Sequence, residues 1–179
     1  MNPFRALRLS CRSTFAAALV AYAALSPVAA LHAQDTTSLA LPERRALKQY
    51  QETKLPELQK NINAAAKFDV PLEIKWNAVA QKDEGKSYLE DDYFTNIYFV
   101  PLTNALKQVT GDAMGAESLK AKLKKVVITY DQATVPISNY ANGVTFENGT
   151  LTINFRPFSN SADVEARSKA IAAGLESKL

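Results

Sequence analysis

The chain has 179 residues, with 21 Lys and Arg, 18 Asp and Glu, and a formal net charge of +3. It contains one histidine, His32, and one cysteine, Cys11, both close to the N-terminus. Several kinds of site need a histidine or a cysteine inside the fold. They are Ser-His-Asp and Cys-His nucleophiles, Cys/His zinc sites, and haem sites with His or Cys ligands. Whether the working protein keeps His32 therefore decides whether these classes are excluded.

The first 33 residues have the order of a secretory signal peptide. Residues 1–14 carry three arginines and no acid, residues 15–25 are apolar, and small residues follow up to Ala33. The apolar run is shorter than the roughly 20 residues that a membrane span needs. Cleavage fits after Ala30 or after Ala33. A lipid-attachment cysteine would follow the apolar run, whereas Cys11 precedes it. We therefore predict a cleaved signal peptide over residues 1–33.

Cleavage after Ala33 would change the composition of the chain. The remaining 146 residues contain no Cys and no His, and the loss of three arginines lowers the net charge from +3 to zero. The basicity of the full chain is then no argument for nucleic acid or an anionic membrane as partner. We expect a mobile leader over 34–41 and a single domain over 42–179, long enough to bury about two thirds of its unfolded surface.

The N-terminal segment, from the signal peptide to the start of the remaining chain, also carries a resemblance. Its alanine-rich run and the polar start "QDTTS" of the remaining chain resemble exported proteins of Burkholderia-like Gram-negative bacteria. This resemblance covers about the first 35 residues and implies a periplasmic or secreted protein. It implies no functional family, and no site residues follow from it.

The first half of the remaining chain alternates between helical and strand periodicity. Residues 42–68 have an apolar stripe at helical spacing, and Pro56 predicts a kink or two helices end to end. Residues 70–78 alternate with period two and predict a strand, and the polar segment 80–92 predicts a loop. Residues 91–109 return to helical spacing, with Pro101 in the middle.

The second half contains the strongest structural signal. A short helix over 116–125 and a strand over 125–131 lead through a connection to the segment 143–158. There Asn148-Gly149, between two alternating strands, predicts a two-residue type I′ hairpin in which Glu147 faces Thr150. The segment 159–179 predicts a C-terminal helix capped by Asn160 or Ser161.

These elements predict an α+β fold in the order α-β-α-α-β-β-β-α. Four strands with one apolar face each, and helices with single apolar stripes, make a two-layer sandwich. We expect a mainly antiparallel sheet of about four strands packed against helices.

Few residue groups in this chain could carry chemistry. An acidic cluster could bind calcium through hard oxygen ligands, but its spacing is not that of an EF-hand, and Asp91 or Asp92 could instead cap the following helix. A pair of carboxylates acting as in glycosidases is a further alternative. The weak metal candidates are Asp83, Glu84, Glu90, Asp91 and Asp92. We expect no cofactor.

Two further groups have an alternative in simple packing or solvation. The lysines at 120, 122, 124 and 125 could bind an anion or a peptidoglycan-side group, or could be a solvated helix end that favours the helix dipole. Aromatic residues at helical spacing are usually core. The best candidates for a ligand or partner surface are Trp76, Tyr88, Tyr93 and Phe99.

The sequence favours a non-catalytic exported protein, a binding, inhibitor or accessory module or a surface antigen, that acts through a protein surface on another exported or envelope protein. One alternative is a carrier of a small ligand or lipid, with an apolar pocket between sheet and helices near Trp76. Another is a carboxylate-dependent enzyme acting on cell-wall glycans. A membrane span in the mature chain and nucleic-acid binding are not expected.

Overall fold

The computed structural model of the protein describes residues 39–82, 85–89 and 92–179. The predicted signal peptide and most of the predicted leader lie outside the described residues. The described part contains these elements: α1 (Leu41–Thr53), α2 (Leu55–Ala66), β1 (Leu72–Ile74), α3 (Trp76–Val79), α4 (Gly85–Leu89), the π-helix η1 (Thr95–Phe99), α5 (Val100–Val109), α6 (Ala113–Lys122), β2 (Lys125–Thr129), the 3-10 helix η2 (Tyr140–Gly143), β3 (Val144–Glu147), β4 (Thr150–Asn154) and α7 (Val164–Glu176).

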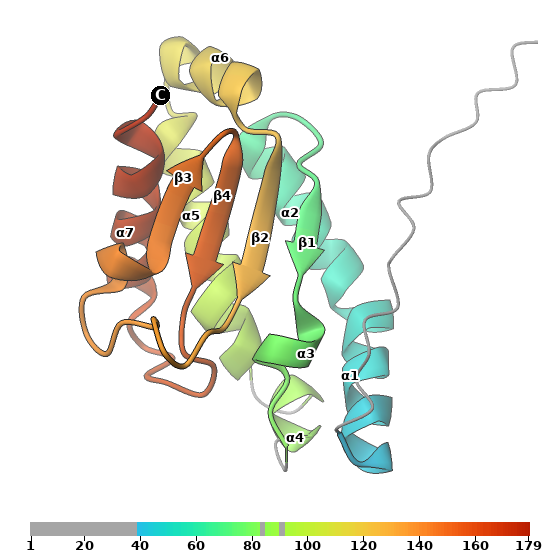
Figure 1. Ribbon diagram of the computed structural model, residues 1–179. Coiled ribbons are helices and arrows are strands. Elements are labelled where there is room, and N and C mark those ends of the chain that lie inside the picture. Colours follow the sequence, from blue (N-terminus) through green and yellow to red (C-terminus); the bar gives the residue numbers. More distant parts are fainter. Residues whose placement is uncertain (1–38, 83–84, 90–91) are drawn as a thin grey trace, which may run out of the picture. The chain divides into compact units, whose positions relative to one another are not determined.

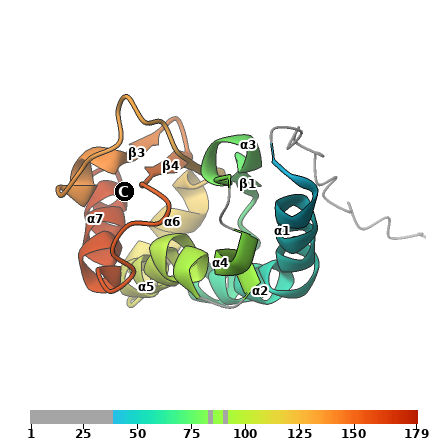
Figure 2. The same ribbon diagram turned by 90° about the horizontal axis from the view of Figure 1, so that it is seen from below.

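The domain has an α+β architecture, as predicted, with a four-stranded sheet packed against helices. Figure 1 shows α2, α5 and α7 behind one face of the sheet, and Figure 2 shows the helices as a layer along that face. The side chains of Val126, Ile128, Leu151 and Ile153 point into this interface and are buried. Among the described residues, no helix is long and apolar enough to cross a membrane.

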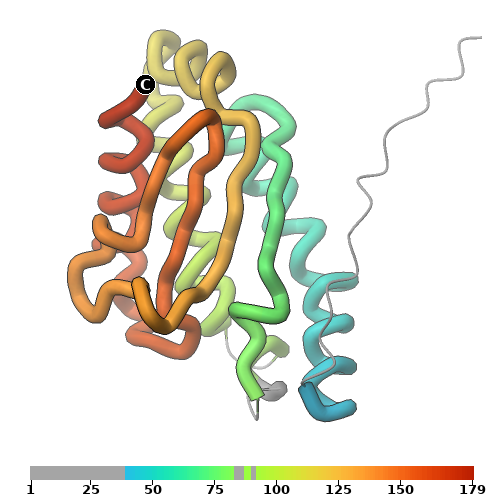
Figure 3. The backbone as a smooth tube through the Cα atoms, in the orientation of Figure 1, coloured from blue at the N-terminus to red at the C-terminus, as the bar shows by residue number. Residues whose placement is uncertain are grey.

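The direction of the strands differs from the prediction. The order in the sheet is β1-β2-β4-β3, where β1 pairs parallel with β2, β2 pairs parallel with β4, and only the β3–β4 pair is antiparallel. The expectation of a mainly antiparallel sheet was therefore wrong. The helices between β1 and β2 carry the chain back to the end of the sheet where β1 begins, so β2 runs parallel to β1 (Figure 3). The hairpin then places β4 beside β2 and β3 at the edge of the sheet.

The hairpin itself is confirmed in its turn and register. Asn148 and Gly149 have φ values of 51° and 82°, the positive values that a type I′ turn requires. Glu147 pairs with Thr150, and Phe146 pairs with Leu151. The turn sequence therefore determined the hairpin, because a two-residue loop leaves one register.

Two local predictions in the first half were wrong. The predicted strand 70–78 is a strand only over Leu72–Ile74, because the backbone leaves the extended region at Lys75 and Trp76–Val79 form a helical turn. The predicted loop 80–92 contains α4, whose Tyr88 is fully buried. At both places a large aromatic side chain, Trp76 or Tyr88, is buried in a helical turn. The local periodicity of the sequence does not show such tertiary packing.

The start of the first helix agrees with the prediction within one residue, but the starts of two later helices differ. α1 begins at Leu41, and Leu39 before it is buried. The helix predicted over 116–125 begins earlier, because the carboxylate of Asp112 accepts a hydrogen bond from the Gly115 N–H at 2.7 Å and caps α6. The Asn160 side chain accepts from the Ala162 N–H instead of capping α7, which begins at Val164.

Candidate functional site

Three of the aromatic residues predicted as a ligand or partner surface come together in a buried cluster around Tyr50 and Phe94. The ring of Tyr50 lies 6.4 Å from those of Trp76, Tyr88 and Phe99. Trp76 is 5% exposed, and Tyr88 and Phe99 are fully buried. These three therefore contribute packing between α1, α3, α4 and η1, and any contact they make with a ligand stays a prediction.

Phe99 is buried because of the π-helix. The Val100 N–H donates to the carbonyl of Thr95, five residues back, and Pro101 has no N–H to continue the ordinary α-helical pattern. The wider turn rotates Phe99 into the core beside Phe94, with ring centres 5.9 Å apart. The prediction assumed an ordinary α-helix, in which Phe99 lies outside the buried stripe, and it did not include this wider turn.

Tyr93, the fourth predicted residue, is half-buried and stacks on Phe158 at 5.5 Å. Phe158 follows β4 and has a positive φ of 56°. The segment after β4 thus covers the edge of the aromatic cluster.

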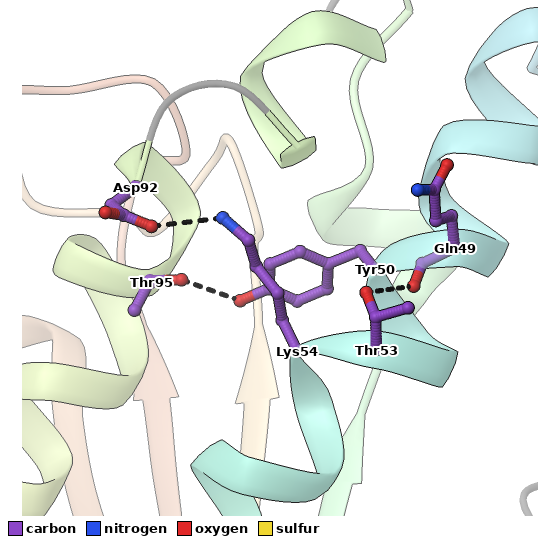
Figure 4. A network of polar contacts seen from close by, with 6 residues as sticks. All are labelled: Gln49, Tyr50, Thr53, Lys54, Asp92 and Thr95. Atoms are coloured by element: carbon purple, nitrogen blue, oxygen red, sulfur yellow. Dashed lines mark hydrogen bonds and ion pairs between the residues drawn. The ribbon is translucent and has the colours of Figure 1, made fainter.

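Polar contacts tie the cluster to the helices around it (Figure 4). The hydroxyls of Tyr50 and Thr95 share a hydrogen bond of 3.0 Å, and the Lys54 ammonium lies 3.1 Å from the Asp92 carboxylate. Burial raises the pKa of Tyr50 far above its ordinary value, so its hydroxyl stays protonated. These contacts join α1 and the start of α2 to η1.

Of the acidic cluster predicted as a weak metal candidate, only Asp92 is among the described residues, and it pairs with Lys54. Asp83, Glu84, Glu90 and Asp91 lie outside them. The residues that the structure describes contain no group of three His, Cys, Asp or Glu side chains that could hold a metal ion.

On the sheet face away from the helices, one row across the strands has three polar residues and one valine. Glu73, Val127, Thr152 and Thr145 lie side by side across the four strands. The Glu73 carboxylate accepts hydrogen bonds from the ammonium of Lys75 and, at 2.9 Å, from that of Lys125. These hydrogen bonds, the one from Lys75 first, hold the pKa of Glu73 below its ordinary value.

We expect the free energy of unfolding of the Glu73→Gln variant to fall less than that of the unaltered protein as the pH is lowered from 7 to 3. A lowered pKa in the folded state stabilises the fold above the unfolded value of about 4.3, and this contribution is lost as the pH falls through the folded pKa. Because the Glu73 side chain is 34% exposed, the loss at pH 7 is at most about 1 kcal/mol. Urea unfolding between pH 7 and 3 measures it. Glu117→Gln, at an exposed position of α6, is the control, and an equal change in both variants would contradict the assignment.

The loop 131–139, between β2 and η2, is built by side-chain hydrogen bonds. The Asp131 carboxylate accepts from the Ala133 N–H at 3.0 Å and from the Thr134 hydroxyl at 2.9 Å. Asn154 on β4 accepts from the Asp131 N–H at 2.9 Å and donates to the Thr134 hydroxyl at 3.1 Å. The start of the loop is therefore held both by its own residues and by the neighbouring strand.

Ile137 stands at the tip of this loop. It is 93% exposed, while Val135 and Pro136 before it are half-buried. On the far side of the tip, the Asn139 side chain accepts from the Ala141 N–H at 3.2 Å. An apolar side chain is thus presented between two hydrogen-bonded ends.

This loop lies at the edge where three parallel strands end. β1, β2 and β4 run in one direction, and α3, loop 131–139 and the segment 155–163 follow their carboxyl ends (Figures 1 and 3). In open sheets with parallel strands, this edge is where binding sites usually form. The signal that could have identified the loop in the sequence is the apolar pair Pro136-Ile137 inside a polar connection.

Sequence reasoning also missed Arg167, which supports the same edge from α7. Its guanidinium is fully buried and lies 4.5 Å from the ring centre of Tyr140. It donates to the Asn160 carbonyl at 2.8 Å and to the Ser159 hydroxyl at 2.9 Å. Arg167 therefore holds the segment 155–163 against α7, while its Nε has no acceptor among the described residues.

The fold and this edge define an α+β domain with a mixed four-stranded sheet and an exposed, braced loop at the carboxyl ends of its parallel strands. Comparisons of the chain with protein-family models, with curated proteins and with solved structures find no significant match.

Proposed function

We propose that this protein is an exported, non-catalytic binding protein that acts on another protein through loop 131–139. The observation that carries the proposal is Ile137, 93% exposed at the tip of a loop whose ends are hydrogen-bonded. Burying such a side chain in a partner's apolar pocket contributes roughly 1.5–3 kcal/mol. This is the scale of an interface anchor.

The bracing of the loop supports binding for an entropic reason. Ordering a flexible segment on association costs free energy, and a loop held in one conformation beforehand avoids much of that cost. Asp131 and Asn154 hold the loop in this way from two different elements. The contact from β4 therefore limits the conformations of the loop before a partner binds.

The sequence supports the location and the lack of catalysis. The basic, apolar and small-residue order of residues 1–33 favours export to the periplasm or the medium, where the partner would be another exported or envelope protein. After cleavage behind Ala33, no imidazole or thiol remains for nucleophilic or acid-base chemistry. An inhibitor, an accessory subunit and a surface antigen all fit this description.

The test is capture of a stoichiometric protein partner from the periplasm and culture supernatant of the source cells. Ile137→Asp should weaken binding of that partner at least thirtyfold, because a charged side chain would replace the apolar anchor. Asn154→Ala, which removes both contacts to the loop, should weaken it several-fold with Ile137 still present. Surface plasmon resonance with the purified partner measures both.

Met114→Asp is the matched control. Met114 is 78% exposed on α6, at the opposite end of the sheet, and the same charge there should leave binding unchanged. Equal affinity of the Ile137→Asp variant and the unaltered protein would reject the loop as the binding site.

A further inference from the structure

A pocket of about 550 Å³ opens at the other end of the sheet, beside the hairpin turn. Figure 1 shows α6, the β3–β4 turn and the end of the chain together there, away from loop 131–139. The pocket is lined by Ala121, Lys122, Lys124, Phe146, Glu147, Asn148, Gly149 and Lys178. The lining thus contains three lysines and one acidic residue, Glu147, and the buried ring of Phe146 supplies an apolar part.

The hairpin turn packs directly on the residues that follow α6. The carbonyl of Gly149 accepts from the N–H groups of Lys124, at 2.8 Å, and Lys125, at 3.2 Å. A Cβ atom at Gly149 would lie 2.7 Å from the Lys122 carbonyl oxygen, so only glycine allows this approach. The turn and the end of α6, which both line the pocket, are therefore held together.

The three lysines of the lining differ in their contacts. The ammonium of Lys122 donates to the carbonyl of Lys178 at 2.7 Å and to that of Leu179, which ties the segment after α7 to α6. Lys124 and Lys178 are exposed and make no ion pair with a described carboxylate. The stem of Lys124 packs against Gly149 of the hairpin turn, and its ammonium and that of Lys178 have no carboxylate partner among the described residues.

We propose that this pocket binds a phosphoryl group, held by the ammonium groups of Lys124 and Lys178 with the Asn148 carboxamide beside them. Lysine is a common phosphate ligand that acts as a compact charge. The group could belong to a free phosphate compound or to a phospholipid headgroup. This site is independent of the proposed protein-binding loop, because the two lie at opposite ends of the sheet.

The experiment is a titration of the purified protein with sodium phosphate at constant ionic strength, followed by amide chemical shifts. The amides of Lys124, Asn148 and Gly149 should shift along one saturable curve. The double variant Lys124→Gln, Lys178→Gln should raise the dissociation constant at least fivefold. Both positions are exposed, so the fold should be kept, and an unchanged spectrum elsewhere verifies this.

Lys120→Gln is the matched control, since Lys120 is exposed on α6, four residues before Lys124, but outside the lining. A second arm measures sedimentation with phosphatidylcholine vesicles, with and without phosphatidylglycerol. Saturable phosphate binding that only the double variant weakens supports a free phosphate compound, and vesicle binding weakened in the same way supports a headgroup. Binding in neither arm, or an equal loss in Lys120→Gln, overturns the proposal.

Discussion

Arg167→Ala is expected to lower the free energy of unfolding by about 3–5 kcal/mol, as large-to-small changes at fully buried positions do. The change removes a guanidinium that stacks on Tyr140 and donates to Asn160 and Ser159. It leaves a cavity, and it leaves the Asn160 carbonyl without its donor. Urea unfolding at neutral pH measures the loss.

Two further variants separate the causes of that loss. Arg167→Met keeps much of the volume and removes the charge, so it should recover part of the stability, since the guanidinium has no carboxylate partner among the described residues to offset its burial. Arg156→Ala, at an exposed position of the same segment, should change stability by less than about 0.5 kcal/mol. Equal losses in Arg156→Ala and Arg167→Ala would show that Arg167 does not hold the segment.

Phe94→Ala should cost a similar amount, about 3–5 kcal/mol, for a different reason. The ring of Phe94 contacts five other rings, and the nearest, that of Tyr98, lies at 4.9 Å. Because Phe94 stacks on Trp76 at 5.6 Å, the fluorescence of this single tryptophan should also change in the native state. Phe94→Leu should lose less, because it fills part of the cavity.

Met114→Ala is the control for the Phe94 series. Met114 is 78% exposed, so its truncation should stay within about 0.5 kcal/mol of the unaltered protein. A Phe94→Ala variant as stable as Met114→Ala would mean that the aromatic cluster does not form the core of this end of the domain.

Local chemistry in the sequence predicted several elements correctly. Asn148-Gly149 determined the hairpin and its register, because only residues that adopt positive φ fit a two-residue turn. Pro56 lies in the first turn of α2, where its missing N–H costs nothing, and the predicted break falls at Lys54. Such signals are readable because one or two residues decide the local backbone.

The candidate site could be predicted only in part. Trp76, Tyr88 and Phe99 do meet, but in the core, because the π-helix and α4 turn them inward. Loop 131–139 and Arg167 were missed, because the loop depends on Asn154 and the burial of Arg167 against Tyr140 depends on how α7 packs. Asn154 lies 23 residues from Asp131, and no local pattern joins the two.

The sequence by itself determined the α+β class and the hairpin, since composition, period and turn chemistry are local properties. Only the tertiary structure decided the parallel pairing of β2 with β1 and β4, since strand direction depends on how the helices carry the chain back. The tertiary structure also decided which apolar side chains are exposed and which are buried. Ile137 and Phe99 are both apolar, and packing alone leaves the first exposed and buries the second.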